Sequence, residues 1–260
     1  MEFNKSILVV QAHPDDTEAW CSGTLKLLKD RGYKITIATM TAGGMGGINS
    51  TEEDTIRIRR EEAKKAAVVL DAEYVCLEQS DGFLFDNREL RLKLISLMRR
   101  VKAGIVFTHL NWDYHSDHRT TAVICDAAAM ISSLPNAPVE EEPLAVTPLL
   151  YHTAPMTLSD PLGASIPAPH FFIDIGETIE TKMEMLAYHV SQQELMKHMH
   201  KMDDFFGEMK KYNKELGNMC GVPYAECFWQ QLGGGYQKDP QVQNELKEYL
   251  YKIKQEKING

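Results

Sequence analysis

The chain has 260 residues, of which 43% are hydrophobic and 25% are charged. This length is enough to bury a sizeable core in one domain. The formal net charge of −9 argues against nucleic acid or an anionic membrane as a partner. No stretch approaches the roughly 20 apolar residues of a membrane span, and the short apolar run in MEFNKSILVV is not expected to act as a signal peptide.

The five cysteines are scattered, odd in number and free of C-x-x-C pairs. This pattern is typical of reduced thiols rather than of a disulfide framework or a structural zinc site. We therefore expect a cytoplasmic enzyme.

Predicted strands and helices alternate in the first half of the chain. The nearly continuous apolar run SILVVQ is typical of a strand that is buried on both faces of a parallel sheet. The order β-α, repeated four times, predicts an α/β, Rossmann-like three-layer fold with a mainly parallel sheet and helices on both faces. The predicted strands are 6–11, 34–41, 73–77 and 104–108, and the predicted helices are 17–31, 55–70, 88–101 and 119–131.

Eight prolines fall within a 35-residue stretch after Ser133. Short strands are predicted at 149–153 and 171–175, a long helix at 179–201 and a polar helix at 241–255. We interpret the Pro-rich stretch as an irregular insertion that forms a rim beside the sheet. The expected organisation is a single domain over 1–260, with an α/β core at 1–133, the Pro-rich rim at 134–170 and a C-terminal helical part at 171–260.

The segment A-H-P-D-D-T-E follows the first predicted strand. Ligands bind at the carboxyl ends of strands in parallel α/β sheets. His13 and Asp16 are three residues apart, so both side chains can point to one side at the start of a helix, and imidazole and carboxylate groups suit Zn²⁺. Asp15 would then face the vacant side of the metal, where a water binds. The alternative is that Asp15 or Asp16 only caps the helix.

The segment H-S-D-H follows the fourth predicted strand. A catalytic zinc usually has three protein ligands and one open position. His118 could supply the third ligand, with His115 and Asp117 nearby as an acid and a supporting group. Taken alone, the alternative is a loop with two exposed histidines. Because both clusters follow strands of one sheet, we favour a metal site.

These segments make the chain resemble the LmbE-like, or PIG-L, family of metal-dependent N-acetyl deacetylases. The resemblance rests on AHPDDTE at 12–18, IRREEAKKAAVVL at 58–70, WDYHSDH at 112–118, KMEMLAYHVSQ at 182–192 and GVPYAECF at 221–228. It implies a zinc-dependent hydrolase that removes an acetyl group from an N-acetylglucosamine-type sugar or its conjugate, with Fe²⁺ or Co²⁺ as other candidate metals.

By this resemblance, His13, Asp16 and His118 match the zinc ligands. Asp15 matches the general base, which takes a proton from the attacking water and delivers it to the leaving amine.

The resemblance also assigns roles around the ligands. His115 matches the histidine that, when protonated, stabilises the developing charge, and Asp117 matches its orienting partner. Arg59 matches an arginine of the substrate pocket. The chain departs from the family pattern at Ser116, where a proline is usual, and at 41–44, which reads T-A-G-G in place of T-x-G-E.

Three other functions remain as alternatives. They are an amidase acting on another small N-acyl conjugate, a two-metal phosphoesterase, and a non-hydrolytic metal- or nucleotide-binding Rossmann-like module. The turn after the first predicted strand lacks the G-x-G-x-x-G pattern of dinucleotide binding, which disfavours the last of these. The expected partner is a small N-acetylated sugar or glycoconjugate, with no nucleic acid and no membrane, and a homo-oligomer is left open. We interpret His109 as a neighbour of the site or a structural residue, and His189 as a packing or pocket residue.

Overall fold

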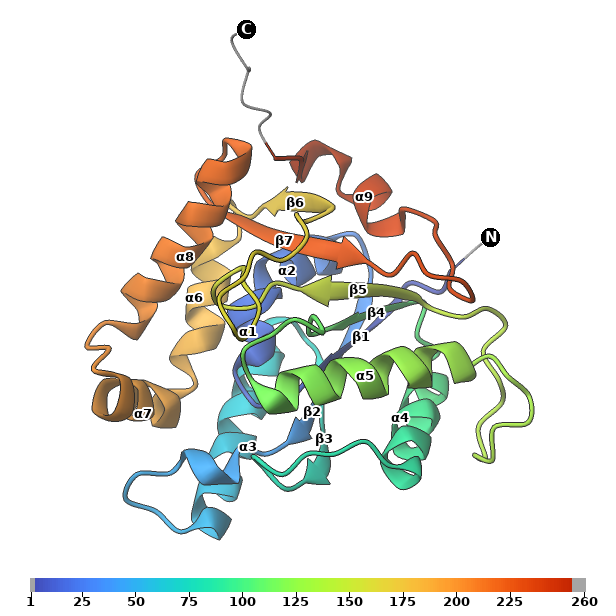
Figure 1. Ribbon diagram of the computed structural model, residues 1–260, viewed down its shortest axis with the longest axis horizontal. Helices are drawn as coiled ribbons and strands as arrows, with labels where there is room; N and C mark the ends of the chain where they lie inside the picture. Colours follow the sequence, from blue (N-terminus) through green and yellow to red (C-terminus); the bar gives the residue numbers. More distant parts are fainter. Residues whose placement is uncertain (1–2, 254–260) are drawn as a thin grey trace, which may run out of the picture.

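The computed structural model describes residues 3–253, in which one eight-stranded sheet forms the centre of the molecule (Figure 1). The strand order is β3-β2-β1-β4-β5-β7-β6-β8. The first five strands in this order pair in parallel, and β7, β6 and β8 extend the sheet in antiparallel fashion. The strands are β1 (Ser6–Gln11), β2 (Lys34–Thr41), β3 (Glu73–Gln79), β4 (Ile105–Thr108), β5 (Leu149–Thr153), β6 (Phe171–Asp174), β7 (Ala225–Gln230) and β8 (Leu250–Tyr251).

Strand β1 lies in the middle of the parallel part of the sheet. All six of its residues are buried, and Val9 pairs with Ile37 of β2 on one side and Phe107 of β4 on the other. A strand covered by helices on both faces has no solvent side, which explains why its sequence does not alternate between polar and apolar residues. The predicted mainly parallel α/β fold is confirmed.

Helices cover both faces of the sheet (Figure 1). Ile7 and Val9 of β1 belong to an apolar cluster with α1, α2, α3 and α6, whereas Leu8 and Val10 point the other way, into a cluster with α4 and α5. The helices are α1 (Asp16–Trp20), α2 (Ser22–Asp30), α3 (Glu52–Val69), α4 (Arg88–Arg100), α5 (Ser116–Ile131), α6 (Ile179–Ala187), α7 (Val190–His200), α8 (Phe205–Cys220) and α9 (Gln241–Glu245), with 3-10 turns η1 (Gly44–Gly46) and η2 (Lys247–Tyr249).

The predicted continuous helix over 17–31 is wrong, because the chain breaks into α1 and α2 at Cys21. Cys21 has φ −149° and ψ 2°, outside the helical region. The carboxylate of Glu226, about 200 residues later in the chain, accepts hydrogen bonds from the backbone N–H groups of Gly23 (3.1 Å) and Thr24 (2.8 Å). These are free donors of the first turn of α2, so a distant side chain starts the new helix.

The predicted helix over 179–201 is also divided, into α6 and α7. The cause is similar: the Glu62 carboxylate of α3 accepts hydrogen bonds from the backbone N–H (2.9 Å) and the hydroxyl (2.6 Å) of Ser191, in the first turn of α7. His189, which lies between the two helices, is fully buried. In both cases a carboxylate from another element satisfies the new helix start.

The C-terminal region differs most from the expectation. The predicted helix over 241–255 is only the short α9, after which Leu250 of β8 pairs with Ile173 of β6; residues 254–255 lie outside the described part. Helix α8 and strand β7 have no counterpart among the predicted elements. No helix within residues 3–253 has the length and apolar character needed to cross a bilayer.

Candidate active site

A pocket of about 420 Å³ opens where parallel strands β1, β3 and β4 end. Its position agrees with the rule that ligands bind at the carboxyl ends of such strands. Its His, Asp and Arg lining residues are His13, Asp15 and Asp16 after β1, Arg59 from α3, Asp81 after β3, and His115 and His118 around the start of α5. Six of the seven predicted site residues therefore line one pocket, and the seventh, Asp117, lies directly behind His13.

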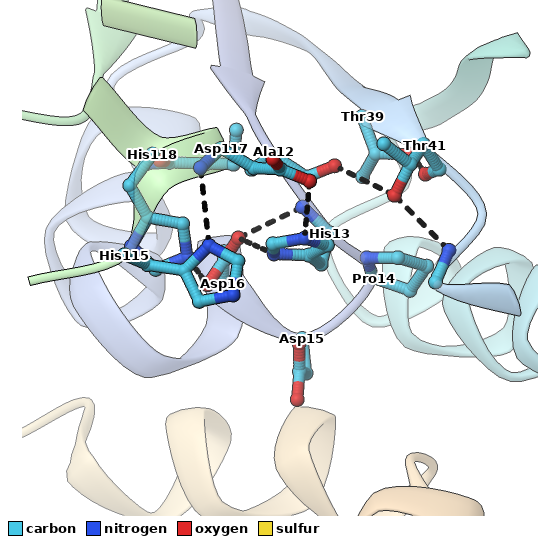
Figure 2. A network of polar contacts seen from close by, with 12 residues as sticks. Ala12, His13, Pro14, Asp15, Asp16, Thr39, Thr41, His115, Asp117 and His118 are labelled. Carbon is cyan, nitrogen blue, oxygen red and sulfur yellow. Dashed lines mark hydrogen bonds and ion pairs between the residues drawn. The ribbon is translucent and has the colours of Figure 1, made fainter. Parts of the chain in front are cut away.

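Asp16 lies between two imidazole rings (Figure 2). One carboxylate oxygen is 3.3 Å from Nδ1 of His13, and the other is 3.3 Å from Nε2 of His118. The turn fixes this carboxylate, because Oδ2 accepts the backbone N–H of His13 (2.8 Å) and Oδ1 accepts the indole N–H of Trp20 (3.2 Å).

The remaining nitrogen of each ring faces a further carboxylate. Nε2 of His13 lies 3.1 Å from Asp81 and 3.4 Å from Asp117, and Nδ1 of His118 lies 3.0 Å from Asp113. Histidines that bind metals usually direct their second N–H at a carboxylate or carbonyl oxygen in this manner. Nδ1 of His13 and Nε2 of His118, each 3.3 Å from Asp16, are thus the nitrogens that do not face these further carboxylates.

The spacing of these atoms fits a small divalent ion. Two N or O ligands about 2.1 Å from one ion, at a tetrahedral angle, are about 3.4 Å apart. The distance from Asp16 Oδ2 to His13 and the distance from Asp16 Oδ1 to His118 are both 3.3 Å, so each contact agrees with that value through a different carboxylate oxygen. Three groups of side chains have donor atoms that lie within 4.8 Å of one another: His13 with His115 and His118, Asp16 with His109 and His118, and His13 with Asp81 and Asp117.

The charges of the site favour a bound cation. Burial lowers the pKa of His13, but hydrogen bonds to the surrounding carboxylates outweigh this effect and hold the pKa well above its ordinary value. Burial also lowers the pKa of His118, yet Asp16 and Asp113 raise it to about 9. The carboxylates therefore favour the protonated, positively charged form of each of these two rings. A divalent metal would compensate the negative charge of the same carboxylates.

His109, directly after β4, is oriented differently. Its ring stacks on His118 with centroids 3.8 Å apart, and its Nε2 accepts the backbone N–H of Ala12 at 2.9 Å. Burial and the neighbouring His118 lower the pKa of His109 to about 4, so the ring is neutral. Nε2 of His109 also lies 3.3 Å from Asp16, so His109 supports the ring of His118 directly beside the candidate ligands.

Asp15 points away from the imidazole cluster (Figure 2). It holds the N-cap position of α1 with φ 98°, but its side chain makes no capping hydrogen bond. Its Oδ1 lies 3.4 Å from Nη2 of Arg59, and burial raises the pKa of Asp15 to about 6 although Arg59 opposes that shift. A role as the cap of α1 therefore does not explain the position of the Asp15 carboxylate.

Arg59 is buried and held by the backbone. Its guanidinium donates to the carbonyl oxygens of Pro14 (2.7 Å) and Gly43 (2.9 Å). Gly43 has φ 69°, and a β-carbon at this position would collide with the Arg59 guanidinium. The Gly-rich segment after β2 thus lets Arg59 reach the pocket, and Asp81 anchors the same segment by accepting the N–H of Met45.

His115 caps helix α5. Its Nδ1 accepts the backbone N–H of Asp117 at 3.2 Å, so the backbone of Asp117 contacts this ring. Burial, together with His13 and His118, lowers the pKa of His115. With Nδ1 accepting the N–H of Asp117, a neutral ring carries its proton on Nε2.

Three residues near the site had no predicted role. Asp113 lies inside the WDYHSDH segment. Asp81 follows β3, so the rule that ligands bind at the carboxyl ends of parallel strands applies to Asp81 as it does to His13 and His118. Gln192 is buried in the pocket lining, and its amide nitrogen has no hydrogen-bond partner among the described residues. Gln192 ends the KMEMLAYHVSQ segment of the resemblance, but that segment gave it no role.

Residues 8–129 match the PIG-L family, described as GlcNAc-PI de-N-acetylase. The structure of the conserved protein TT1542 from Thermus thermophilus is 31% identical, with a TM-score of 0.70 and coverage of 87% of this chain and 94% of that chain. The chain belongs to the PIG-L/LmbE family. The predicted family is thereby confirmed.

Curated relatives of this PIG-L/LmbE chain differ in their reactions. A diacetylchitobiose deacetylase of Thermococcus kodakarensis is 28% identical over 233 residues, which cover 85% of this chain and 81% of the relative. A 4-oxalmesaconate hydratase of Pseudomonas putida is 24% identical over 230 residues, which cover 85% of this chain and 87% of the relative. The reaction of this PIG-L/LmbE protein therefore has to be argued from its own site.

Proposed function

We propose that this protein is a zinc-dependent hydrolase that removes the acetyl group from an N-acetylglucosamine-type sugar or its conjugate. One observation carries the proposal. Asp16 lies 3.3 Å from a ring nitrogen of His13 and of His118, and the other nitrogen of each ring faces a carboxylate. His13, Asp16 and His118 would hold the metal. When bound, the metal polarises the amide carbonyl and makes water a better nucleophile.

Asp15 acts as the general base in this proposal. It lines the same pocket as the three ligands, and in the proposal it takes the proton of the attacking water and delivers it to the leaving amine. Arg59, fixed by two backbone carbonyls, orients the Asp15 carboxylate from 3.4 Å. Arg59 is buried, so it lacks the conformational freedom of a surface arginine.

His115 supports the developing negative charge on the amide oxygen. Its Nδ1 is occupied by the backbone N–H of Asp117, which leaves the N–H on Nε2 as the donor. The backbone N–H of His115 in turn donates to Asp113 at 2.9 Å, so both the ring and the backbone of His115 are held by hydrogen bonds. A donor held before the reaction begins needs little reorganisation to stabilise the transition state.

The substrate class is supported by polar groups beside the ligands. Asp81, Arg59 and the unpartnered amide nitrogen of Gln192 lie in the same pocket and can bind sugar hydroxyls. Tyr114 also lines the pocket and offers an aromatic face to a sugar ring. The relative that acts on diacetylchitobiose agrees with this class.

Acetate release tests the proposal. Protein loaded with Zn²⁺, Co²⁺ or Fe²⁺ is compared with chelator-treated protein on N-acetylglucosamine, its methyl β-glycoside, diacetylchitobiose and an acetyl-lysine peptide. We expect metal-dependent acetate release that is faster from the glycosides than from the free sugar, and none from the peptide. If the peptide is the best substrate, or if the metal-loaded protein releases no acetate from any of the sugars, the proposal is wrong.

A further inference from the structure

A further buried histidine lies behind the candidate ligands, outside the pocket lining. His152 is a residue of β5, where it pairs with Thr108 of the neighbouring strand β4 (Figure 1). Its side chain points to the face of the sheet that α4 and α5 cover, as does that of Leu150, two residues before it. His152 is only 5% exposed, so its ring nitrogens need polar partners inside the protein.

Both ring nitrogens of His152 face oxygen atoms. Nδ1 lies 2.7 Å from the carbonyl oxygen of His109, and Nε2 lies 3.6 Å from Oδ1 of Asp126 in α5. Because a carbonyl oxygen can only accept a hydrogen bond, Nδ1 carries a proton and donates it. The ring of His152 therefore joins the turn after β4 to helix α5.

The carbonyl of His109 lies where the pairing of the two strands stops. Strand β4 ends at Thr108, whose own carbonyl oxygen accepts the hydroxyl of Thr153 at 3.2 Å. His109 is the next residue and is fully buried, so its carbonyl oxygen needs a donor beyond the end of the ladder. The N–H of His152 is that donor, and it fixes the peptide from which the chain leaves the sheet.

His109 in turn contacts both segments that carry candidate ligands. Its Nε2 accepts the backbone N–H of Ala12, which directly precedes His13, and its ring stacks on that of His118. Asp126, the other contact of His152, follows His118 by about two turns of α5. His152 thus contacts both parts of the molecule that hold the ring of His118.

We propose that His152 is a positioning residue of the metal site. Its N–H fixes the carbonyl of His109, and this keeps the imidazole of His109 against His118 and the N–H of Ala12. The proposal rests on the ligand assignment of the proposed function. Loss of a group that orients a metal ligand typically costs about 10–100-fold in metal affinity, and because His152 acts through His109 we expect about tenfold.

Metal affinity of matched variants tests the role of His152. His152→Asn keeps an N–H at the position of Nδ1, His152→Gln moves it to the position of Nε2, and His152→Leu removes it. The Kd of Zn²⁺ is measured by competition with a chromophoric chelator, and the visible absorption of Co²⁺-loaded protein reports the ligand geometry. We expect His152→Gln and His152→Leu to weaken Zn²⁺ binding about tenfold and to change the Co²⁺ spectrum, whereas His152→Asn stays within about threefold of the wild type. If His152→Leu does not fold, the Asn and Gln variants decide the same question.

Tyr151→Phe is the control for a general loss of packing. Tyr151 precedes His152 in β5, is fully buried and donates its hydroxyl to Gln243 (3.1 Å) on the other face of the sheet. Loss of this hydrogen bond should lower Tm but leave the Zn²⁺ affinity and the Co²⁺ spectrum unchanged. If Tyr151→Phe weakens Zn²⁺ binding as much as His152→Gln does, the proposal is overturned.

Hydrogen exchange of metal-free protein gives a second readout. The amide hydrogen of Ala12, which is bonded to the ring of His109, should exchange about tenfold faster in His152→Gln than in His152→Asn. Equal exchange rates and equal Zn²⁺ affinities in these two variants overturn the proposal and leave the proposed function intact. The expected differences, in a protein whose metal-loaded wild type releases no acetate from any sugar, support the role of His152 and refute the deacetylase proposal.

Discussion

The ion pair between Lys182 and Glu226 is the most deeply buried charged contact of the C-terminal part. The Lys182 side chain has no exposed area, and its ammonium donates to Glu226 (2.8 Å) and to the carbonyl of Ala19 (2.7 Å). Lys182→Met would leave the Glu226 carboxylate buried with only the N–H groups of Gly23 and Thr24. Breaking one side of such a pair costs about 3–5 kcal/mol, and because two hydrogen bonds remain we expect about 3 kcal/mol.

Urea unfolding of metal-free protein, followed by circular dichroism, measures this change. The same loss should lower Tm by about 6–12 °C. Adding Glu226→Gln to Lys182→Met should recover part of the loss, because the unpaired charge is removed. The control is Lys210→Met, whose pair with Glu180 is equally short (2.7 Å) but exposed, and which should cost less than about 0.5 kcal/mol. A cost below about 1 kcal/mol for Lys182→Met would refute the reasoning.

Two further predictions concern the loop and the ligands. Gly43→Ala should destabilise the protein by about 3 kcal/mol in the same unfolding assay, because a β-carbon there collides with Arg59. The control is Gly32→Ala, which is also at positive φ but has open space around it and should cost about 1 kcal/mol. Equal costs for the two variants would exclude the collision. The purified protein should contain about one divalent ion per chain by elemental analysis, and His13→Ala and His118→Ala should each lose most of it; full occupancy in both variants would contradict the ligand assignment.

Much of the parallel core could be predicted from local sequence. The bounds of β1 and β2 agree with the apolar runs, because strands buried on both faces leave a continuous apolar signal. One general rule, that parallel strands end at one edge of the sheet, predicted that the two His/Asp segments lie close together. His13, Asp16 and His118 do meet there, from segments about 100 residues apart.

The rest depended on contacts that no short window contains. The breaks at Cys21 and His189 arise from carboxylates of other elements, Glu226 and Glu62, so helical periodicity continues across both breaks without revealing them. Gln192, which lines the pocket, follows Ser191, whose backbone N–H and hydroxyl donate to Glu62 in the first turn of α7. The tertiary fold, and not local propensity, decides these positions.

The central claim is that this site hydrolyses an amide with Asp15 as the base beside a bound metal. Turnover and metal content, measured on the same preparations of wild-type protein and Asp15→Asn, test it most directly. The account predicts about one metal ion per chain in both proteins, and a loss of acetate release by a factor of about 10² or more in Asp15→Asn. Near-normal turnover of Asp15→Asn with full metal content would contradict it.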